Sequence, residues 1–274
     1  MINALSIDLE YWWSIELLKG HVPDEINDFV YESAQPLLNL LDKYNIKATF
    51  FVLGMLAERY PELIEDIYYR GHEIASHAYS HKTLYDLGEK RFEEEIIKSK
   101  KILNKYDPIG FRAPSFSIDN NTRWGLQILK NNGFKYDSSI FPIKTMLYGV
   151  PDAPLCIYRP SKEDISQHDP NGGITEFPLT VLDIGRLNLP ISGGFYLRFL
   201  PLRLLKLCMH QINKKRPAIV YVHPWETYSG IPRINVSPSS QFITYHGISN
   251  ALAKLESLLI EFKFNTVRDV LDEV

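Results

Sequence analysis

Residues 48–81 decide the fold, and they read ATFFVLGMLAERYPELIEDIYYRGHEIASHAYSH. The run at 48–53 is rich in β-forming residues, which predicts a strand. Apolar residues with helical spacing follow over 57–70, and Gly71 ends this predicted helix. Residues 72–76 then predict a second short strand. A strand, a helix and a strand in this order predict a βαβ unit with parallel strands.

The same alternation continues on both sides of this unit. Upstream, residues 4–8 predict a buried strand and residues 33–44 predict a helix. The region 140–200 is rich in proline and glycine, so we expect irregular hairpins or loops there. The repeated units predict an α/β fold around a largely parallel sheet, open or closed as a barrel. Further predicted helices lie at 89–106, 121–132 and 247–262, and further strands at 109–112 and 218–223.

Composition excludes several classes of protein. With 45% hydrophobic and 23% charged residues, the 274-residue chain is neither disordered nor a coiled-coil rod. A formal charge of −3 gives no overall reason to bind nucleic acid or an anionic membrane, although it leaves room for a local patch. No apolar run reaches the ~20 residues of a membrane-spanning helix. The N-terminus lacks the basic segment of a signal peptide, so we expect a cytoplasmic protein.

Potentially reactive side chains follow several of the predicted strands. In parallel α/β folds, ligands gather at the carboxyl ends of the strands. We therefore expect these side chains to share one edge of the sheet, and this coincidence is the main reason for a functional interpretation. They are Asp8, Glu10, His77, His81, Arg112 and His223.

Two histidines and two acids suggest a metal site. His77 and His81 can face one point if their segment is helical or tightly turned, and imidazole nitrogens suit zinc. The alternative is an incidental pair. Asp8 and Glu10 are two apart, so in a strand they point to the same side and could supply a ligand and a base. The alternative is a solvated acidic loop. Two histidines and one carboxylate would leave positions open, as in catalytic zinc sites.

Two later motifs could support catalysis. The guanidinium of Arg112 could hold a carboxylate, and Pro114 could aim the following amide at a developing oxyanion. The alternative is a surface arginine beside a structural proline. His223 ends an apolar strand and could act as a general acid or base, or could be a core histidine. Trp225 could offer a face to a sugar or could simply pack.

Taken in order, these motifs resemble the polysaccharide deacetylases, the NodB-type enzymes of carbohydrate esterase family 4. The resemblance runs from residue 4 to about 226, and the tail at 227–274 looks like the branch found in exopolysaccharide biosynthesis loci. It implies a single deacetylase domain over 1–274. The motifs that carry it are Asp8-Leu9-Glu10, ATFFV at 48–52, GHEIASH at 71–77, His81, Arg112-Ala113-Pro114 and Val222-His223.

The family resemblance implies a distorted (β/α)7-type barrel and a divalent metal, most often Zn²⁺, with Co²⁺ or Ni²⁺ as alternatives. Carried over by position, His77 and His81 are metal ligands, and His223 is the general acid. Arg112 positions the catalytic acidic side chain. The backbone NH of Ser115, next to Pro114, is the candidate oxyanion donor.

The first motif departs from the common family pattern of two adjacent aspartates. By analogy with related branches, Asp8 is the base and Glu10 the metal ligand, and the reverse assignment is the alternative. Ser115 stands where an aromatic residue is common, so one wall facing the sugar should differ. Candidate substrate contacts are Tyr196, Arg198 and Trp225.

The resemblance therefore implies metal-dependent hydrolysis of the N-acetyl group of an amino sugar. The expected partner is an N-acetylated cell-surface polysaccharide or its precursor. Hydrolysis of another linear amide, such as a formamide, or of an O-acetyl ester is the first alternative. A carbohydrate-binding protein that keeps the fold without turnover is the second.

Overall fold

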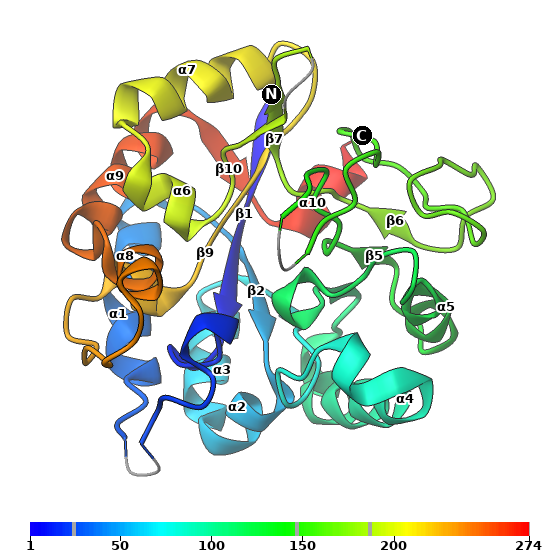
Figure 1. Cartoon of the computed structure of the whole chain (residues 1–274), viewed down its shortest axis with the longest axis horizontal. Helices are drawn as coiled ribbons and strands as arrows, with labels where there is room; N and C mark the ends of the chain where they lie inside the picture. The colour runs from blue at the N-terminus through cyan, green and yellow to red at the C-terminus, as the bar shows by residue number, and fades with distance from the viewer. Residues whose placement is uncertain (24–25, 146–147, 186–187, 274) are drawn as a thin grey trace.

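The computed structural model describes residues 1–23, 26–145, 148–185 and 188–273, and its centre is one eight-stranded sheet. The strand order is β10-β1-β2-β3-β4-β5-β6, and β9 also pairs with β1 (Figure 1). All of these pairings are parallel, as the repeated βα units predict. The strands are β1 (Ile2–Leu9), β2 (Thr49–Val52), β3 (Glu73–Ser76), β4 (Gly110–Phe111), β5 (Tyr136–Asp137), β6 (Thr175–Glu176), β9 (Ile219–Val222) and β10 (Lys263–Asn265).

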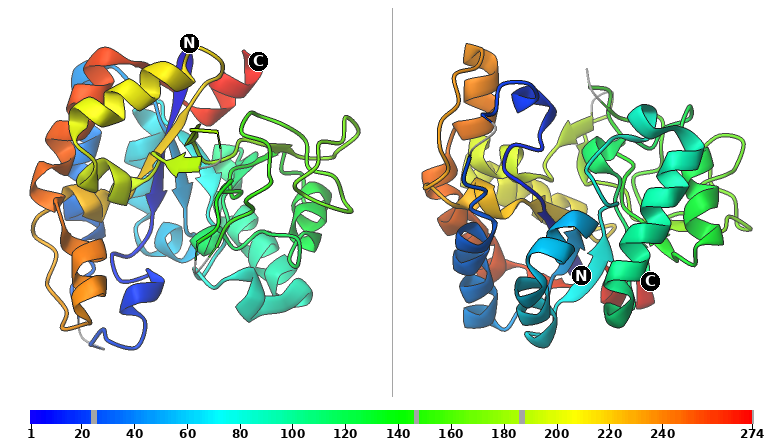
Figure 2. Two further views of the ribbon diagram at one scale, coloured as in Figure 1. Left: turned by 45° about the horizontal axis from the view of Figure 1, so that its top comes forward. Right: turned by 90° about the horizontal axis from the view of Figure 1, so that it is seen from below.

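β1 is the only strand here that pairs with three others among the described residues. β9 pairs along Ala4–Ile7, while β10 pairs near the start of β1 and β2 pairs near its end. No pairing within the described ranges joins β6 to β9, so the sheet curves into a half-barrel rather than closing (Figures 1 and 2). This confirms the expected distorted (β/α) barrel.

Helices cover the outside of the half-barrel, with α4 and α5 on one side and α1, α6, α7 and α9 on the other (Figure 1). Leu5, Ile7 and Leu9 of β1 pack in one buried cluster with leucines of α1 and α9. The helices are α1 (Val30–Tyr44), α2 (Gly54–Arg59), α3 (Pro61–Tyr69), α4 (Leu84–Leu103), α5 (Trp124–Asn131), α6 (Gly194–Phe199), α7 (Leu202–Ile212), α8 (Pro238–Tyr245), α9 (Ile248–Glu261) and α10 (Val267–Asp272). Four short 3₁₀ turns accompany them in the described ranges: η1 (Glu16–Leu18), η2 (Asn104–Tyr106), η3 (Pro114–Phe116) and η4 (Pro224–Thr227).

The prediction of one helix over 57–70 is wrong. Tyr60 has φ −127° and ψ 56°, and Pro61 begins α3 after this break. A proline lacks the backbone NH that an interior helical position donates, so it favours a helix start. α4 starts with a turn before Gly88 that Thr83 caps in a capping box with Asp86. Gly88, with φ 67° and ψ 171°, then breaks the helix, so its regular part begins at residue 89 as predicted.

The region 140–200 contains an antiparallel hairpin of β7 (Val181–Asp183) and β8 (Asn188–Pro190), in agreement with the expected irregular hairpins. Elements that the sequence analysis did not predict are α6, α7, α8, α10, β5, β6 and β10. In the part of the chain that the structure describes, no helix combines the length and apolarity needed to cross a bilayer.

Candidate metal and catalytic site

The carboxyl ends of β1 and β3 bring the predicted metal ligands together. Asp8 lies near the end of β1 and Glu10 directly follows it, while His77 directly follows β3. The segment then turns sharply, because Ala78 and His81 have left-handed φ angles of 61° and 60°. This tight turn brings the two imidazole rings to a centroid distance of 5.2 Å. The sequence analysis expected such a turn if both histidines were to bind one metal ion.

Glu10, His77 and His81 form a buried cluster of metal-ligand type. Oε2 of Glu10 lies 2.5 Å from Nε2 of His81 and 3.6 Å from Nε2 of His77. One potential ligand atom from each residue lies within 4.8 Å of the other two. Burial raises the pKa of Glu10, but the neighbouring His81 and His223 outweigh it and hold this pKa well below its ordinary value.

Two further observations fit a cation at this cluster. Nδ1 of His77 lies 2.7 Å from the carbonyl oxygen of Arg112, so Nδ1 donates this hydrogen bond and Nε2, on the side of Glu10, is the ring nitrogen that could bind a metal. Oε1 of Glu10 is buried without a hydrogen-bond partner among the described residues. Two imidazole nitrogens and a carboxylate are a donor set for Zn²⁺, Co²⁺ or Ni²⁺.

Asp8 has a different environment from Glu10. Its Oδ1 accepts a hydrogen bond of 2.6 Å from Nη1 of Arg112, and both side chains are buried. Arg112 is itself fixed: Nε donates to the carbonyl of Ser138, and Nη2 donates to its hydroxyl, both at 2.9 Å. The guanidinium also lies 4.1 Å from the ring centroid of Phe51. Arg112 is therefore no surface arginine, and it holds the Asp8 carboxylate in one orientation.

His223 faces the two acids from the end of β9. Its Nε2 lies 3.5 Å from Oε1 of Glu10 and 3.9 Å from Oδ2 of Asp8. On the other side of the ring, Nδ1 lies 2.7 Å from Oε2 of Glu226. Burial lowers the pKa of His223, but the surrounding carboxylates of Glu10, Glu226 and Asp8 outweigh this effect and raise it to about 9.

The sequence analysis gave Glu226 no role, yet this residue orients His223. Oε1 of Glu226 accepts hydrogen bonds from Nε and Nη2 of Arg198 at 3.1 and 2.8 Å. Burial raises the pKa of Glu226, but Arg198 and His223 outweigh it and lower this pKa to about 2. The carboxylate is therefore ionised and fixes the proton on Nδ1 of His223. A histidine followed three positions later by a glutamate at a strand end was the available signal.

The turn at η3 places Pro114 and Ser115 beside Arg112. Ser115 and Phe116 both have left-handed φ angles, 51° and 49°, so the chain reverses sharply after the buried Pro114. The Ser115 hydroxyl donates to Glu16 of η1 at 3.2 Å. The role of the Ser115 backbone NH as an oxyanion donor stays a prediction.

A buried acid pair supports this turn from behind. The Ser139 hydroxyl accepts from the backbone NH of Ala113 at 2.7 Å and donates to Asp137 at 2.6 Å. Burial raises the pKa of Asp137 to about 6 and also raises that of its neighbour Glu176. The pair holds the backbone next to Arg112.

Three predicted substrate contacts occupy different environments. The Arg198 guanidinium is buried and bonded to Glu226 and two backbone carbonyls, so its prediction as a substrate contact is wrong. Trp225 is only 4% exposed, and its ring stacks on His223 at 5.3 Å, which makes it a support for His223 rather than an open sugar platform. Tyr196 is half-buried on α6, against Phe141.

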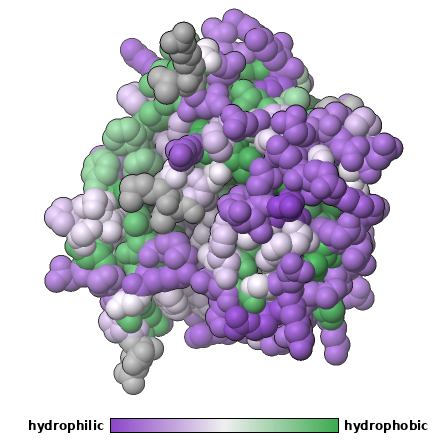
Figure 3. Space-filling model, turned by 45° about the vertical axis from the view of Figure 1, so that its right-hand side comes forward, coloured by the Kyte–Doolittle hydropathy of each residue, from purple (hydrophilic) through white to green (hydrophobic). Residues whose placement is uncertain are grey.

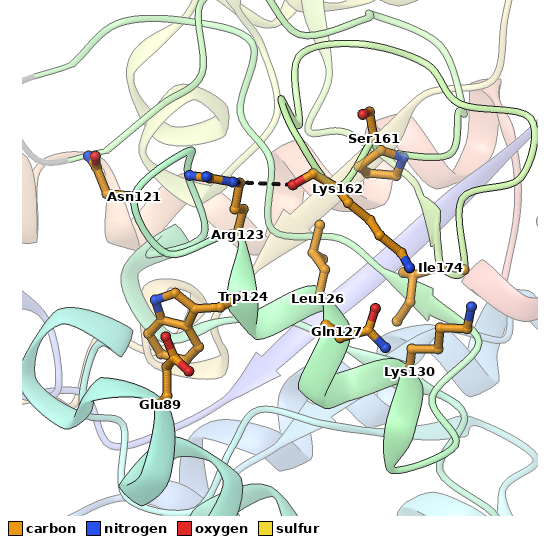
Figure 4. Close-up of a pocket in the computed structure, with 12 residues that line it drawn as sticks. Glu89, Asn121, Arg123, Trp124, Leu126, Gln127, Lys130, Ser161, Lys162 and Ile174 are labelled. Atoms are coloured by element: carbon orange, nitrogen blue, oxygen red, sulfur yellow. Dashed lines mark hydrogen bonds between the residues drawn. The ribbon is translucent and has the colours of Figure 1, made fainter.

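A separate cavity of about 480 Å³ lies on the outer side of α5 and shares no residue with this cluster. Figure 4 shows Arg123, Trp124, Lys130 and Lys162 around it, with Nε of Arg123 donating to the carbonyl of Lys162 at 3.2 Å. None of the predicted site residues lines this cavity.

Two family models match the chain. Residues 26–136 match the model described as polysaccharide deacetylase, and residues 138–272 match a domain of unknown function, DUF3473. The chain contains a polysaccharide deacetylase domain. The segments matched by the two models contribute strands to one sheet: β2, β3 and β4 come from the first, and β6, β9 and β10 come from the second.

Curated relatives of the deacetylase domain match only part of the chain. A peptidoglycan-N-acetylglucosamine deacetylase of Bacillus cereus is 37% identical over 100 residues, which are 35% of this chain and 36% of the relative. A peptidoglycan deacetylase of Helicobacter pylori is 34% identical over 124 residues, 43% of this chain and 41% of the relative. The chain thus spans well under half the length of these two relatives.

Solved structures share the fold of nearly the whole chain. A Mycobacterium smegmatis protein assigned to the polysaccharide deacetylases has a TM-score of 0.67 at 20% identity, covering 100% of this chain and 89% of its own. PuuE allantoinase has a TM-score of 0.61 at 17% identity, covering 99% and 89%. At these identities the likeness shows the fold alone, so chemistry must come from the site.

Proposed function

We propose that this protein is a metal-dependent deacetylase that hydrolyses the N-acetyl group of an amino sugar. The observation that supports this most directly is the convergence of a ligand cluster with two other groups. Glu10, His77 and His81 adjoin an acid held by Arg112 and a histidine held by Glu226. A ligand set, a base and an acid around one point are what amide hydrolysis requires.

In this proposal Glu10, His77 and His81 hold the metal, and Asp8 is the general base. Glu10 lies within reach of both histidines, whereas Asp8 is paired with Arg112. When bound, a divalent ion supplies Lewis acidity for the amide carbonyl and increases the acidity of a water molecule.

The chain's own groups move the protons. Asp8 takes a proton from the water that attacks the acetyl carbon, with its carboxylate oriented by Arg112. The Ser115 NH stabilises the oxyanion. His223 donates a proton to the sugar nitrogen as the carbon–nitrogen bond breaks, releasing acetate and a free amine. Each of these effects typically changes the rate by about 10²–10⁴-fold.

The substrate class follows from the relatives. Those named above are peptidoglycan deacetylases, and Chitin deacetylase 1 of Saccharomyces cerevisiae is 39% identical over 87 residues. An N-acetylglucosamine unit in a polymer or its precursor is therefore the proposed substrate. The exopolysaccharide context, the cytoplasmic location, the choice of zinc and the single domain over 1–274 stay predictions.

The test is acetate release by the metal-loaded protein from N-acetylglucosamine oligomers. Parallel reactions with a formylated amine and an O-acetylated sugar identify the bond that is cut. Wild type should release acetate from the amide, and the variants His77→Ala and Asp8→Ala should each lose most of this activity. If neither variant loses activity, the proposed roles are wrong. Sugar binding with no hydrolysis would instead identify a carbohydrate-binding protein.

A further inference from the structure

The sequence distributes its acids unevenly. Between residues 184 and 255, Glu226 is the only acidic residue, so the rest of the chain carries 32 of the 33 acids. Glu226 is buried and paired with Arg198, so it adds no negative charge to the surface. The same segment carries nine basic residues: Arg186, Arg198, Arg203, Lys206, Lys214, Lys215, Arg216, Arg233 and Lys254. A chain of net charge −3 therefore contains a strongly cationic portion.

This portion also exposes large apolar side chains on α6, α7 and α8. Phe199 is 49% exposed, Leu207 63% and Phe242 44%. The rings of Phe199 and Phe242 are 5.9 Å apart, and Phe195 stacks on Phe199 at 5.6 Å, so α6 and α8 share one aromatic patch. Leu204 and Leu207 lie three apart on α7, which follows α6 directly and lies beside it (Figures 1 and 2).

Several cations of the same segment, at both ends of α7 and just before α8, form no ion pair with a carboxylate within the described residues. They are Arg203, Lys214, Lys215 and Arg233. In contrast, Lys206 and His210 share the carboxylate of Glu261 at 2.6 and 2.7 Å. We define the cationic apolar face as Phe199, Leu204, Leu207 and Phe242 together with the four cations lacking a carboxylate partner.

A recess of about 470 Å³ opens within this face. Arg233 and Phe242 line it together with Gln241 and Ser249, and no aspartate or glutamate is found among its lining residues in the described part of the chain. An arginine, an amide and a hydroxyl are donors suited to a phosphate oxygen. The recess therefore has room and donors for one phospholipid head group.

We propose that the cationic apolar face docks on an anionic phospholipid membrane. Exposed phenylalanines and leucines can insert into the acyl-chain region of a membrane, and the lysines and arginines among them can contact its anionic head groups. A second copy that docked through the same face would place like charges against each other, which opposes a symmetric dimer. A nucleic acid backbone would attract the cations but would leave the leucines and phenylalanines exposed.

The other side of the molecule gives a contrast. Hydrophilic side chains dominate the surface over α4 and α5, which comes forward in Figure 3. Lys130 and Lys162 on that side also form no ion pair with a carboxylate within the described residues, and Arg123 lies near Asp164, whose pKa it helps to lower. These three cations lie around the cavity of Figure 4 and provide a control set of equal charge outside the cationic apolar face.

Vesicle flotation at low salt tests the proposal with the full chain. Wild type should float with vesicles of phosphatidylcholine and phosphatidylglycerol, should not float with phosphatidylcholine alone, and should be released by salt. Each lysine or arginine near an anionic surface contributes about fivefold, so the triple variant R203Q/K214Q/K215Q should bind roughly a hundredfold more weakly. The control triple variant R123Q/K130Q/K162Q should bind like wild type.

Insertion of the apolar side chains into the membrane is measured separately. The variant F199W should be more fluorescent than wild type, and brominated phosphatidylglycerol vesicles should quench the added fluorescence. The variant L207S should bind vesicles more weakly without a change in its urea midpoint. The proposal is wrong if wild type does not bind anionic vesicles, if the two triple variants bind equally weakly, or if the added fluorescence of F199W is not quenched. Salt-sensitive capture of an acidic protein by a chain that does not bind vesicles would also overturn it. None of these readouts requires deacetylation.

Discussion

Replacing Arg112 by methionine should remove the group that holds the candidate base. The substitution keeps an apolar chain over Phe51 but leaves the buried Asp8 carboxylate without its 2.6 Å partner. It also deletes both donors to Ser138. We therefore expect a loss of both folding stability and acetate release.

The magnitude follows from the burial of the pair. Removing one partner of a buried ion pair costs about 3–5 kcal/mol, because the other charge stays uncompensated. Arg70 provides the matched control: its guanidinium pairs with Asp42 and Asp66 near the surface, where removal costs at most about 1 kcal/mol. The double variant Arg112→Met/Asp8→Asn removes both charges. Its cost should fall short of the sum of the single variants by about 1–3 kcal/mol.

Equilibrium urea unfolding with a chelator present measures these differences without a contribution from metal binding. In the metal-loaded protein, misplacement of Asp8 should lower acetate release by about 10²-fold. The reasoning is refuted if Arg112→Met costs no more stability than Arg70→Met. Strict additivity in the double variant would also refute it.

Two further predictions concern pH. The pKa of Glu226 is about 2 against an ordinary 4.5, so ionised Glu226 contributes about 3 kcal/mol above pH 4.5, and this contribution is lost as the pH falls through 2. At neutral pH the urea midpoint of wild type should be higher than that of Glu226→Gln, and the difference should disappear in strong acid. A difference that does not change with pH would contradict the low pKa of Glu226. Burial, followed by the charge of Lys47, lowers the pKa of His72 to about 4 from 6.5. The contribution of neutral His72 to the free energy of unfolding should therefore be fully present above pH 6.5 and fall by about 2 kcal/mol by roughly pH 5. The variant His72→Gln should not show this loss. Equal pH profiles of wild type and variant would contradict this prediction.

The alternation of short apolar strands and helices predicted the parallel sheet, and the family resemblance implied its distorted barrel form. Asp8, His77 and His223 converge because parallel strands present their carboxyl ends at one edge, as the sequence analysis expected. The turn at Ala78 and His81 was compatible with the spacing but not determined by it. Left-handed φ at non-glycine residues is set by tertiary contacts, which a single sequence does not reveal.

The missed parts have identifiable physical causes. Glu226 and Arg198 are far apart in sequence, and only folding shows that one guanidinium neutralises the acid behind His223. α7 has an amphipathic pattern, with Leu205, Met209 and Ile212 buried, that the sequence analysis did not use because it lies beside the irregular region 140–200. Pro61 marked the break between α2 and α3, but the helical spacing on both sides concealed it.

Metal titration with acetate release as the readout tests the central claim most directly. After chelation, the protein should release no acetate from N-acetylglucosamine oligomers, and activity should return to its maximum at one Zn²⁺ per chain. Asp8→Asn should bind the same single ion and still release almost no acetate, because it keeps Glu10, His77 and His81. Full activity in the chelated protein, or in Asp8→Asn, would contradict the claim that these side chains form one hydrolytic site.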